Sequence, residues 1–338
     1  MKQAYVPEPG RILYRDVDKP VIKSHEILLK IARIGICGSD VHVFKGKHPL
    51  VKFPLVQGHE FSGYIEEIGA DVTGFRQGEL VTVEPAIGCG TCRKCEQGVF
   101  AQCDQLQFIG GALPGAGSEF FKVDARYVVK MPQNASADDA AMVEPLAVAV
   151  HSIRKVPEIK GKNLVIIGGG TIGNLTAQVA KFYGANKIIL VDKISFRNTL
   201  AQKLGFLTLE PSQQLEENVK KLLDGEMPPV AFECVGSSAP LNTCLRIVDR
   251  GGYVIVVGVY EEAPKTEMIL VQDKEINVIG SLMYTWFDFL EAVRLIKEAK
   301  VNLELLRTHH FPFERWQDAY DVLMTRPDQA VKVLIDFV

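Results

Sequence analysis

The sequence predicts an α/β protein in which a doubly wound parallel sheet is joined to a β-rich unit. Two patterns carry this prediction. From residue 163 onward, apolar runs with the length of strands alternate with amphipathic segments, as in a parallel sheet with helices on both faces. Before residue 100, short alternating apolar segments are separated by Gly and Pro, which favours short strands. The 338 residues, of which 47% are hydrophobic, can bury the core of one large domain or two ordinary ones.

The first part of the chain shows few helical signals. Residues 27–31 and 61–65 have the short apolar pattern of strands. At Ser136 a good N-cap residue and two acids in the following turn open an Ala-rich segment, which predicts a helix through Val150 with an interruption at Glu144-Pro145. We expect this segment to link the two units.

The second part predicts strands and helices in alternation. An apolar run at 164–167 ends in Gly and precedes an amphipathic helix over 172–183, which stops at the breaker Gly184. Further strands are predicted at 187–191, 230–234 and 253–257, helices at 287–299 and 316–324, and a closing strand at 331–335. This alternation predicts the doubly wound sheet.

Charge and hydropathy exclude several partners. The 38 Lys and Arg nearly balance the 41 Asp and Glu, so nothing in the charge balance indicates the basic surface that nucleic-acid binding requires. The first residues lack the apolar run of a signal peptide, and no segment has the length and apolarity of a membrane span. We therefore expect a cytoplasmic protein with no nucleic-acid or membrane partner.

A glycine-rich turn follows the strand predicted at 164–167. Gly168, Gly170 and Gly173 fit the G-x-G-x-x-G pattern at the start of a helix. In this pattern the first Gly permits a tight turn, the second lets the backbone approach a pyrophosphate, and the third allows helix and strand to pack closely. The helix N-terminus adds N–H donors. We predict a dinucleotide site; the alternative is a turn that only connects strand and helix.

Two charged residues at the next strand bear on the type of dinucleotide. Asp192 stands at the end of that strand, where a carboxylate can accept hydrogen bonds from both hydroxyls of an adenosine ribose and repels a 2′-phosphate. Arg197 lies nearby and suits either the adenosine side or a phosphorylated ribose. The pair favours NAD over NADP.

Four cysteines lie close together in the sequence, at Cys89, Cys92, Cys95 and Cys103. Four thiolates satisfy tetrahedral zinc and leave no position for substrate or water, so we predict a structural zinc site. An iron–sulfur cluster, a redox C-x-x-C pair and disulfides are the alternatives that these residues leave open.

Five motifs occur in a fixed order: Gly35-Ile36-Cys37-Gly38-Ser39-Asp40, Gly58-His59-Glu60, the four cysteines, Glu144-Pro145 and the glycine turn. In this order they resemble the zinc-dependent medium-chain alcohol dehydrogenase family from end to end, and Val143-Glu144-Pro145-Leu146 resembles its sorbitol dehydrogenase branch. The resemblance implies a GroES-like catalytic domain over 1–147 and 286–338 and a Rossmann domain over 148–285. It also implies a homodimer or homotetramer formed through the Rossmann domain, with 267–281 as a candidate edge segment.

The resemblance further implies two zinc ions per chain, one structural and one catalytic. A single Cys or His is by itself most often a core residue. By resemblance, however, Cys37, His59 and Glu60 match ligands of the catalytic zinc, and Glu144 matches a position that either binds the zinc or holds a zinc-bound water. Zinc with an open position acts as a Lewis acid on an alcohol or a carbonyl.

The same resemblance assigns residues to the proton path and the cofactor. Ser39 and His42 match a path that carries the substrate proton away while hydride goes to the nicotinamide; the alternative for His42 is a surface histidine beside the cofactor. For Val257 and Leu282 a place in the sheet core is an equal alternative. The remaining positions that match cofactor contacts are Ile172, Val257-Gly258-Val259 and Ser281-Leu282-Met283.

The resemblance departs from sorbitol dehydrogenases at Val43 and Met283, where that group carries an aromatic residue and an Arg that reach the polyol. The basic loop Phe44-Lys45-Gly46-Lys47-His48 is similar to that of bacterial sugar-acid dehydrogenases. We predict NAD-linked oxidation of a secondary alcohol of a polyol or sugar acid, a small-molecule substrate, to the ketone. The alternatives are a threonine dehydrogenase, a group that tends to carry Asp-Pro-Phe at Glu144-Pro145-Leu146, and a non-catalytic dinucleotide-binding sensor.

Overall fold

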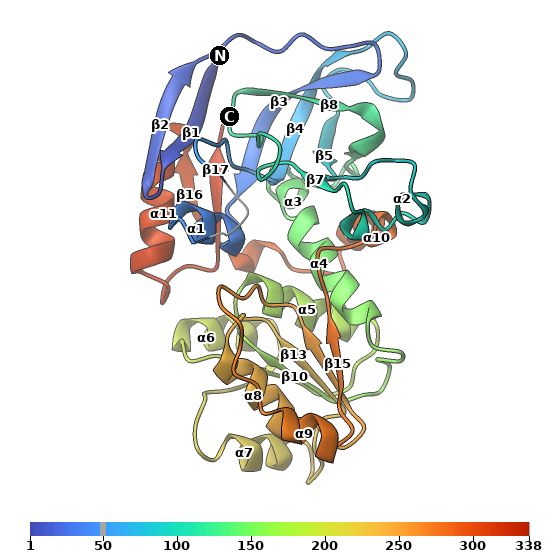
Figure 1. The fold of residues 1–338 in the computed structure, drawn as a ribbon, viewed down its shortest axis with the longest axis vertical. Helices are drawn as coiled ribbons and strands as arrows, with labels where there is room; N and C mark the ends of the chain where they lie inside the picture. Colours follow the sequence, from blue (N-terminus) through green and yellow to red (C-terminus); the bar gives the residue numbers. More distant parts are fainter. Residues whose placement is uncertain (48–51, 338) are drawn as a thin grey trace.

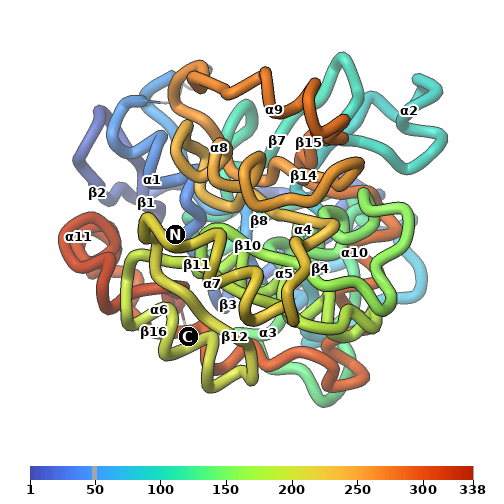
Figure 2. Tube along the Cα trace, turned by 90° about the horizontal axis from the view of Figure 1, so that it is seen from below, coloured from blue at the N-terminus to red at the C-terminus, as the bar shows by residue number. Residues whose placement is uncertain are grey.

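The computed structural model describes residues 1–47 and 52–337 and arranges them around two main sheets (Figure 1). One sheet is fully parallel, with the order β12-β11-β10-β13-β14-β15. Figure 2 labels β12, β11, β10, β14 and β15, which follow one another in this order from the bottom of the view to the top. This order is that of a doubly wound dinucleotide-binding sheet, which confirms the predicted fold class. Its strands are β10 Leu164–Ile167, β11 Ile188–Val191, β12 Leu207–Leu209, β13 Val230–Glu233, β14 Tyr253–Val256 and β15 Asn277–Gly280.

Helices cover both faces of this sheet because its central strands are apolar on both sides. The helices are α4 Val143–Arg154, α5 Thr171–Phe182, α6 Ser195–Lys203, α7 Leu215–Leu222, α8 Ser238–Ile247, α9 Met268–Asp273 and α10 Trp286–Lys297. Leu164 and Ile166 point to the face that carries α4, α5, α6 and α10. Val165 and Ile167 point to the opposite face, which carries α7 and α8. The side chains of this one strand thus alternate between two separate hydrophobic cores.

The second sheet combines both ends of the chain. Its order is β16-β17-β3-β4-β5-β9, and β8 pairs with β3. The last strand, β17, runs antiparallel to β3, so it lies beside the strand that leads to Cys37. The strands are β3 Glu26–Gly35, β4 Glu60–Ile68, β5 Leu80–Val83, β8 Phe120–Asp124, β9 Val128–Lys130, β16 Arg307–Pro312 and β17 Lys332–Asp336; two small sheets pair β1 Lys2–Glu8 with β2 Arg11–Asp16 and β6 Ala86–Ile87 with β7 Gln107–Phe108.

The remaining helices are short and pack mainly against the second sheet. Trp316 and Tyr320 of α11 are nearly fully buried in the core that also holds Ile31 and Phe61. These helices are α1 Gly38–Phe44, α2 Arg93–Glu96, α3 Ala137–Ala141, α11 Trp316–Thr325 and the 3-10 turns η1 Phe100–Gln102, η2 Ala125–Tyr127, η3 Glu304–Leu306 and η4 Phe313–Arg315. Within 1–47 and 52–337, no helix is long and apolar enough to cross a bilayer.

The helical segment between the two sheets breaks at Met142 rather than at Glu144-Pro145 as predicted. Pro145 lies in the first turn of α4, where a missing backbone N–H removes no helical hydrogen bond, so α4 continues to Arg154. Position 147, the predicted domain boundary, lies inside this helix. The boundaries at 147 and 286 stay predictions.

Asp288 joins the two helices at this junction, α4 and α10. Its carboxylate accepts from Arg154 NH1 at 2.6 Å and from Thr285 Oγ1 at 2.7 Å, and His151 Nδ1 lies 2.7 Å from Oδ2. Burial would raise the pKa of Asp288, but the hydrogen bonds from His151 and Thr285 lower it to about 2. The carboxylate is therefore charged and paired at neutral pH.

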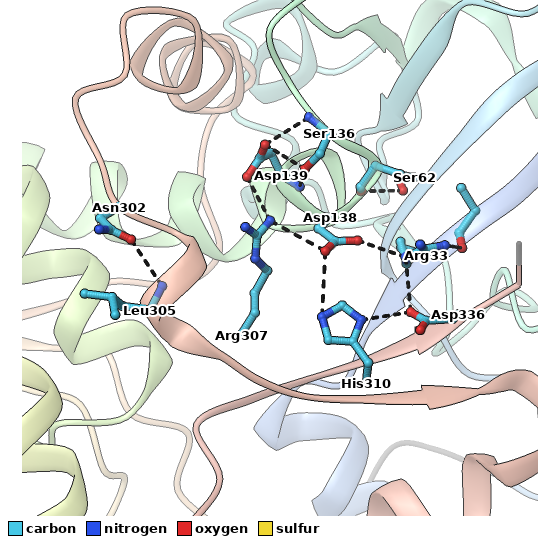
Figure 3. A network of polar contacts seen from close by, with 12 residues as sticks. Arg33, Ser62, Ser136, Asp138, Asp139, Asn302, Leu305, Arg307, His310 and Asp336 are labelled. Atoms are coloured by element: carbon cyan, nitrogen blue, oxygen red, sulfur yellow. Dashed lines mark hydrogen bonds and ion pairs between the residues drawn. The ribbon is translucent and has the colours of Figure 1, made fainter.

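A second polar cluster fastens α3 to the strands from both chain ends (Figure 3). Arg33 Nε on β3 lies 2.8 Å from Asp138 Oδ1 on α3 and 3.1 Å from Asp336 Oδ1 on β17. Arg307 on β16 donates to Asp139 Oδ1 at 2.9 Å. The C-terminal strands are thus tied by charge as well as by β-pairing to the N-terminal part of the chain.

Candidate functional site

The structure brings together three of the four residues predicted to bind the catalytic zinc. Cys37 follows β3, while His59 and Glu60 stand where β4 begins, and Gly35 pairs with Glu60 across these two strands. One donor atom from each of Cys37, His59 and Glu60 lies within 4.8 Å of the others. His59 and Glu60 are buried, with exposures of 4% and 1%. A thiol, an imidazole and a carboxylate in this proximity form a donor set that suits zinc.

Lys332, which is not among the predicted site residues, lies directly beside this donor set. Its Nζ donates to Glu60 Oε1 at 2.8 Å and to the carbonyl oxygen of Ile36 at 3.0 Å. Burial alone would lower the pKa of Lys332. The negative charge of Glu60 outweighs this effect and raises the pKa above its ordinary value, so the ammonium stays protonated. The negative charge of Glu60 is thereby compensated inside the protein.

Asp40 orients the candidate metal-binding residues Cys37 and His59, and Gln57 in turn holds Asp40. Asp40 Oδ2 accepts from the backbone N–H of Cys37 at 3.0 Å, and its Oδ1 lies 3.5 Å from His59 Nδ1. Gln57 Nε2 donates to the backbone oxygen of Asp40 at 3.0 Å and its Oε1 accepts from Tyr320 at 2.6 Å. A carboxylate beside a metal-binding imidazole fixes the ring and its tautomer. Asp40 is the last residue of the motif that contains Cys37, but its position in the sequence does not by itself predict this role.

Glu144 lies close enough to the donor set to interact electrostatically with it, but it is not among the three groups within 4.8 Å. It stands in the first turn of α4 and is 6% exposed. Burial raises the pKa of Glu144 to about 7; the charge of His59 lowers it and that of Glu60 raises it. Its role at the zinc stays a prediction.

The predicted proton-path residues Ser39 and His42 lie on α1, the helix that follows Cys37. His42 Nδ1 lies 2.8 Å from Glu261 Oε1, and Lys47 Nζ lies 2.9 Å from Glu261 Oε2. One of the two lysines of the basic loop, Lys47, is therefore paired with an acid, while His48 of the same loop lies outside the described residues. Val43, adjacent to His42, is 5% exposed and belongs to the core of the second sheet.

The four predicted cysteines converge. Cys92 Sγ lies 3.5 Å from Cys95 Sγ and 3.9 Å from Cys103 Sγ, and Cys89 Sγ lies 3.9 Å from Cys95 Sγ. Sulfur atoms around tetrahedral zinc, at Zn–S distances of about 2.3 Å, are about 3.8 Å apart. All four are free thiols, so the spacing fits a metal and not disulfide bonds.

The glycine turn has the geometry that its sequence predicts. A Cβ on Gly173 would collide with the backbone oxygen of Gly168, and Gly168 itself has φ of 108°, so neither position tolerates a side chain without strain. Gly170 is the N-cap of α5, and a Cβ there would meet open space. Ile172 is half-buried in the first turn of the same helix. The backbone at Gly170 is thus open to a phosphate.

Asp192 follows β11 beside this turn. Its Oδ2 accepts from the backbone N–H of Gly169 at 2.7 Å, and its Oδ1 accepts from that of Ile194 at 2.9 Å. Arg197 NH1 lies 3.5 Å from Asp192 Oδ2, and the buried Nε of Arg197 has no hydrogen-bond partner among the described residues. An unpaired buried donor beside a carboxylate and a glycine turn fits the adenosine end of a dinucleotide.

The other predicted cofactor residues follow the ends of β14 and β15. Val257 and Gly258 are half-buried, whereas Val259 is 51% exposed. Ser281 is buried and its Oγ lacks a hydrogen-bond partner among the described residues; Leu282 is 63% exposed, which argues against a place in the sheet core, and Met283 is half-buried. These positions lie beyond the carboxyl ends of parallel strands, where doubly wound sheets bind ligands.

Comparison with known proteins decides the family. Residues 23–133 match the family model of the alcohol dehydrogenase GroES-like domain, and residues 171–298 match that of zinc-binding dehydrogenases. Sorbitol dehydrogenase 2 of Saccharomyces cerevisiae is 32% identical over 330 residues, covering 94% of this chain and 92% of that protein. The chain belongs to the zinc-dependent medium-chain alcohol dehydrogenase family. This dehydrogenase is therefore an oxidoreductase that uses zinc and a nicotinamide dinucleotide, as predicted.

Further relatives and structures agree with the family. L-idonate 5-dehydrogenase of Vitis vinifera is 32% identical over 332 residues, covering 94% of the dehydrogenase chain and 89% of that protein. Galactitol-1-phosphate dehydrogenase of Escherichia coli superposes with a TM-score of 0.91 at 29% identity, with all of both chains covered. An alcohol dehydrogenase of Escherichia coli CFT073 in complex with NADH superposes with a TM-score of 0.92 at 26% identity, covering 100% and 99% of the two chains.

Proposed function

We propose that this dehydrogenase oxidises a secondary alcohol of a polyol or sugar acid to the ketone and transfers the hydride to NAD. The observation that carries the proposal is the group of half-buried Cys37 with buried His59 and Glu60, in the same chain as an open glycine turn. The similarity to sorbitol and L-idonate dehydrogenases supports the substrate class.

Cys37, His59 and Glu60 would hold the catalytic zinc, with Glu144 as a fourth ligand or as the acceptor for a bound water. Zinc supplies Lewis acidity, which makes a hydroxyl more acidic. Lys332 keeps Glu60 in place and compensates its charge. Asp40 holds the Cys37 backbone and faces the His59 ring, so the donors are oriented before the metal binds.

Ser39 and His42 would carry the substrate proton to solvent. A hydroxyl can accept and donate a proton in turn, and an imidazole titrates near neutral pH. His42 is 28% exposed, so a proton that reaches its ring can pass on to water. This path lets the alcohol lose its proton without a strong base.

The dinucleotide would lie along the glycine turn with its ribose at Asp192 and its nicotinamide near Val257-Gly258-Val259 and Ser281-Leu282-Met283. Both oxygens of Asp192 already accept backbone N–H groups, and each retains a second lone pair for a ribose hydroxyl. The negative charge disfavours a 2′-phosphate, which favours NAD over NADP. The pairing of Lys47 with Glu261 means that this lysine does not by itself select an anionic substrate.

The four cysteines would hold a second, structural zinc.

We also propose a homodimer, or a homotetramer built from it, formed through the edge of the parallel sheet. β15 is the last strand of that sheet, and Val278 on it is 44% exposed, with Met268 and Ile269 of α9 exposed at 61% and 74%. An uncovered apolar edge strand is a surface on which a second copy can pair. The seven free thiols suit the cytoplasm.

The test is to follow absorbance of the reduced nicotinamide while the zinc-loaded protein meets polyols, hexonates, sugar phosphates and threonine, each with NAD and with NADP. We expect turnover with NAD on a polyol or a hexonate. Turnover on threonine alone would support the threonine dehydrogenase alternative. Dinucleotide binding without turnover on any substrate, in protein that lacks the catalytic zinc, would support the sensor alternative.

A further inference from the structure

Glu261 connects the two halves of the dehydrogenase at His42. It stands in the loop after β14 of the parallel sheet. Its two partners come from the N-terminal part of the chain, since His42 lies on α1 and Lys47 lies just after the end of that helix. The carboxylate contacts His42 Nδ1 at 2.8 Å through one oxygen and Lys47 Nζ at 2.9 Å through the other. The side chains of His42 and Glu261 are only 28% and 32% exposed.

The loop that carries Glu261 is anchored at its base. Tyr260 Oη donates to Glu233 Oε2 at 3.0 Å, and the backbone N–H groups of Val257 and Gly258 donate to the Glu233 carbonyl at 2.8 and 2.9 Å. Glu233 is fully buried, and its other carboxylate oxygen accepts from two backbone N–H groups at 2.8 Å. The residue before Glu261 is thus fixed to β13, which gives Glu261 a defined position.

A carboxylate at Nδ1 determines which ring nitrogen of a histidine carries the proton. An ionised carboxylate oxygen has no proton to offer, so its 2.8 Å approach to Nδ1 favours the tautomer that carries the proton on Nδ1 and leaves the lone pair of the neutral ring on Nε2. A carboxylate placed in this way also stabilises the imidazolium after Nε2 takes up a proton. The contact therefore prepares His42 to accept a proton on Nε2 and to release it to water.

We propose that Glu261 is the positioning residue of the proton path: it fixes the tautomer and orientation of His42 and ties α1 to the cofactor-side loop. This inference rests on the proposed role of His42. Because Glu261 stands in the same loop as Val257-Gly258-Val259, the position of this loop also sets the orientation of the His42 ring that takes up the proton. Lys47 compensates part of the Glu261 charge and lowers the pKa of that carboxyl, which keeps it ionised.

The direct test is ¹⁵N NMR of the histidine rings in the zinc-loaded protein without dinucleotide, with the His42 signals assigned through His42→Gln. We expect the wild-type ring to carry its proton on Nδ1, and Glu261→Ala to shift it toward Nε2, the tautomer that free histidine favours. The control is Glu262→Ala, which removes the neighbouring acid and should leave the ring unchanged. An Nε2-protonated ring in the wild type overturns the inference even if no variant folds.

Kinetics supply the second readout. Glu261→Ala should lower kcat about tenfold and change KM for the alcohol much less, because the proposed role of Glu261 acts through His42 and not through substrate binding. Glu261→Asp should recover part of kcat, and Glu262→Ala should match the wild type. An unchanged kcat in Glu261→Ala overturns the positioning role. A wild-type enzyme that reduces NAD in the absence of any alcohol would instead overturn the proposed function. The NMR measurement needs no turnover, so this failure and a failure of the positioning role can be told apart.

Discussion

Lys332 Nζ on the last strand of the chain lies 2.8 Å from Glu60 Oε1, a predicted zinc ligand 272 residues earlier. Both side chains are almost completely buried, at 3% and 1% exposure. The pairing of β17 with β3 and of β3 with β4 creates this contact, since it brings the C-terminal strand beside the segment before Cys37. The metal-binding group therefore depends on both ends of the chain.

Removal of the Lys332 charge should destabilise the zinc-free protein. Lys332→Met leaves the Glu60 carboxylate buried without its cation, which typically costs about 3–5 kcal/mol. Urea unfolding of metal-free protein measures the loss. The double variant Lys332→Met/Glu60→Gln should recover most of it, because it removes both charges. Equal stability of Lys332→Met and the wild type would contradict the buried pairing.

Asp288 should contribute stability that is lost in acid. Its folded pKa is lowered to about 2 from the ordinary 3.8, so the carboxylate stabilises the folded state above the ordinary pKa, and this contribution disappears as the pH falls through about 4 toward 2. Asp288→Asn should be less stable than the wild type at pH 6, with the gap closing in that window. Asp224→Asn, which alters an 81% exposed carboxylate, is the control and should follow the wild type throughout.

Removal of the structural zinc should be visible at Trp286. The backbone N–H of Trp286 donates to the Gly98 carbonyl at 2.9 Å, and Gly98 lies between Cys95 and Cys103. Cys92→Ser should therefore lose one zinc per chain and change the tryptophan fluorescence, whereas Cys244→Ala should retain all zinc. Atomic absorption and emission spectra measure both. Full zinc content in Cys92→Ser would show that this cysteine is not a ligand.

Asp192 should set the choice between dinucleotides. In Asp192→Ala the repulsion of a 2′-phosphate is lost, while the nearby Arg197 remains. We expect the ratio of kcat/KM for NAD to that for NADP to fall at least about tenfold. The ratio is informative even if the loss of the hydrogen bonds to Gly169 and Ile194 lowers the amount of folded protein. An unchanged ratio would assign the preference to other residues.

Local patterns predicted most of the parallel sheet because its elements are specified by neighbours in sequence. The strand at 164–167 and the glycine turn have the predicted bounds, and helix 172–183 is displaced by one residue. The break at Met142 was missed, since Pro at an early helical position looks like a helix breaker in sequence although the first turn accommodates it.

The long-range partners of the candidate site could not be predicted, because only the fold brings them to it. Lys332 did carry a signal: a single lysine in the apolar run 331–335 is unusual for a buried strand. Glu261 carried none, since an exposed-looking Glu-Glu pair in a loop is ordinary, and only the contact with His42 distinguishes it from Glu262.

Zinc content and NAD reduction should be measured together in the wild type and in Cys37→Ser, with the best substrate from the panel. We expect two zinc ions per chain and turnover in the wild type, and one zinc ion with turnover lost in the variant. Two zinc ions and undiminished turnover in Cys37→Ser would contradict this expectation.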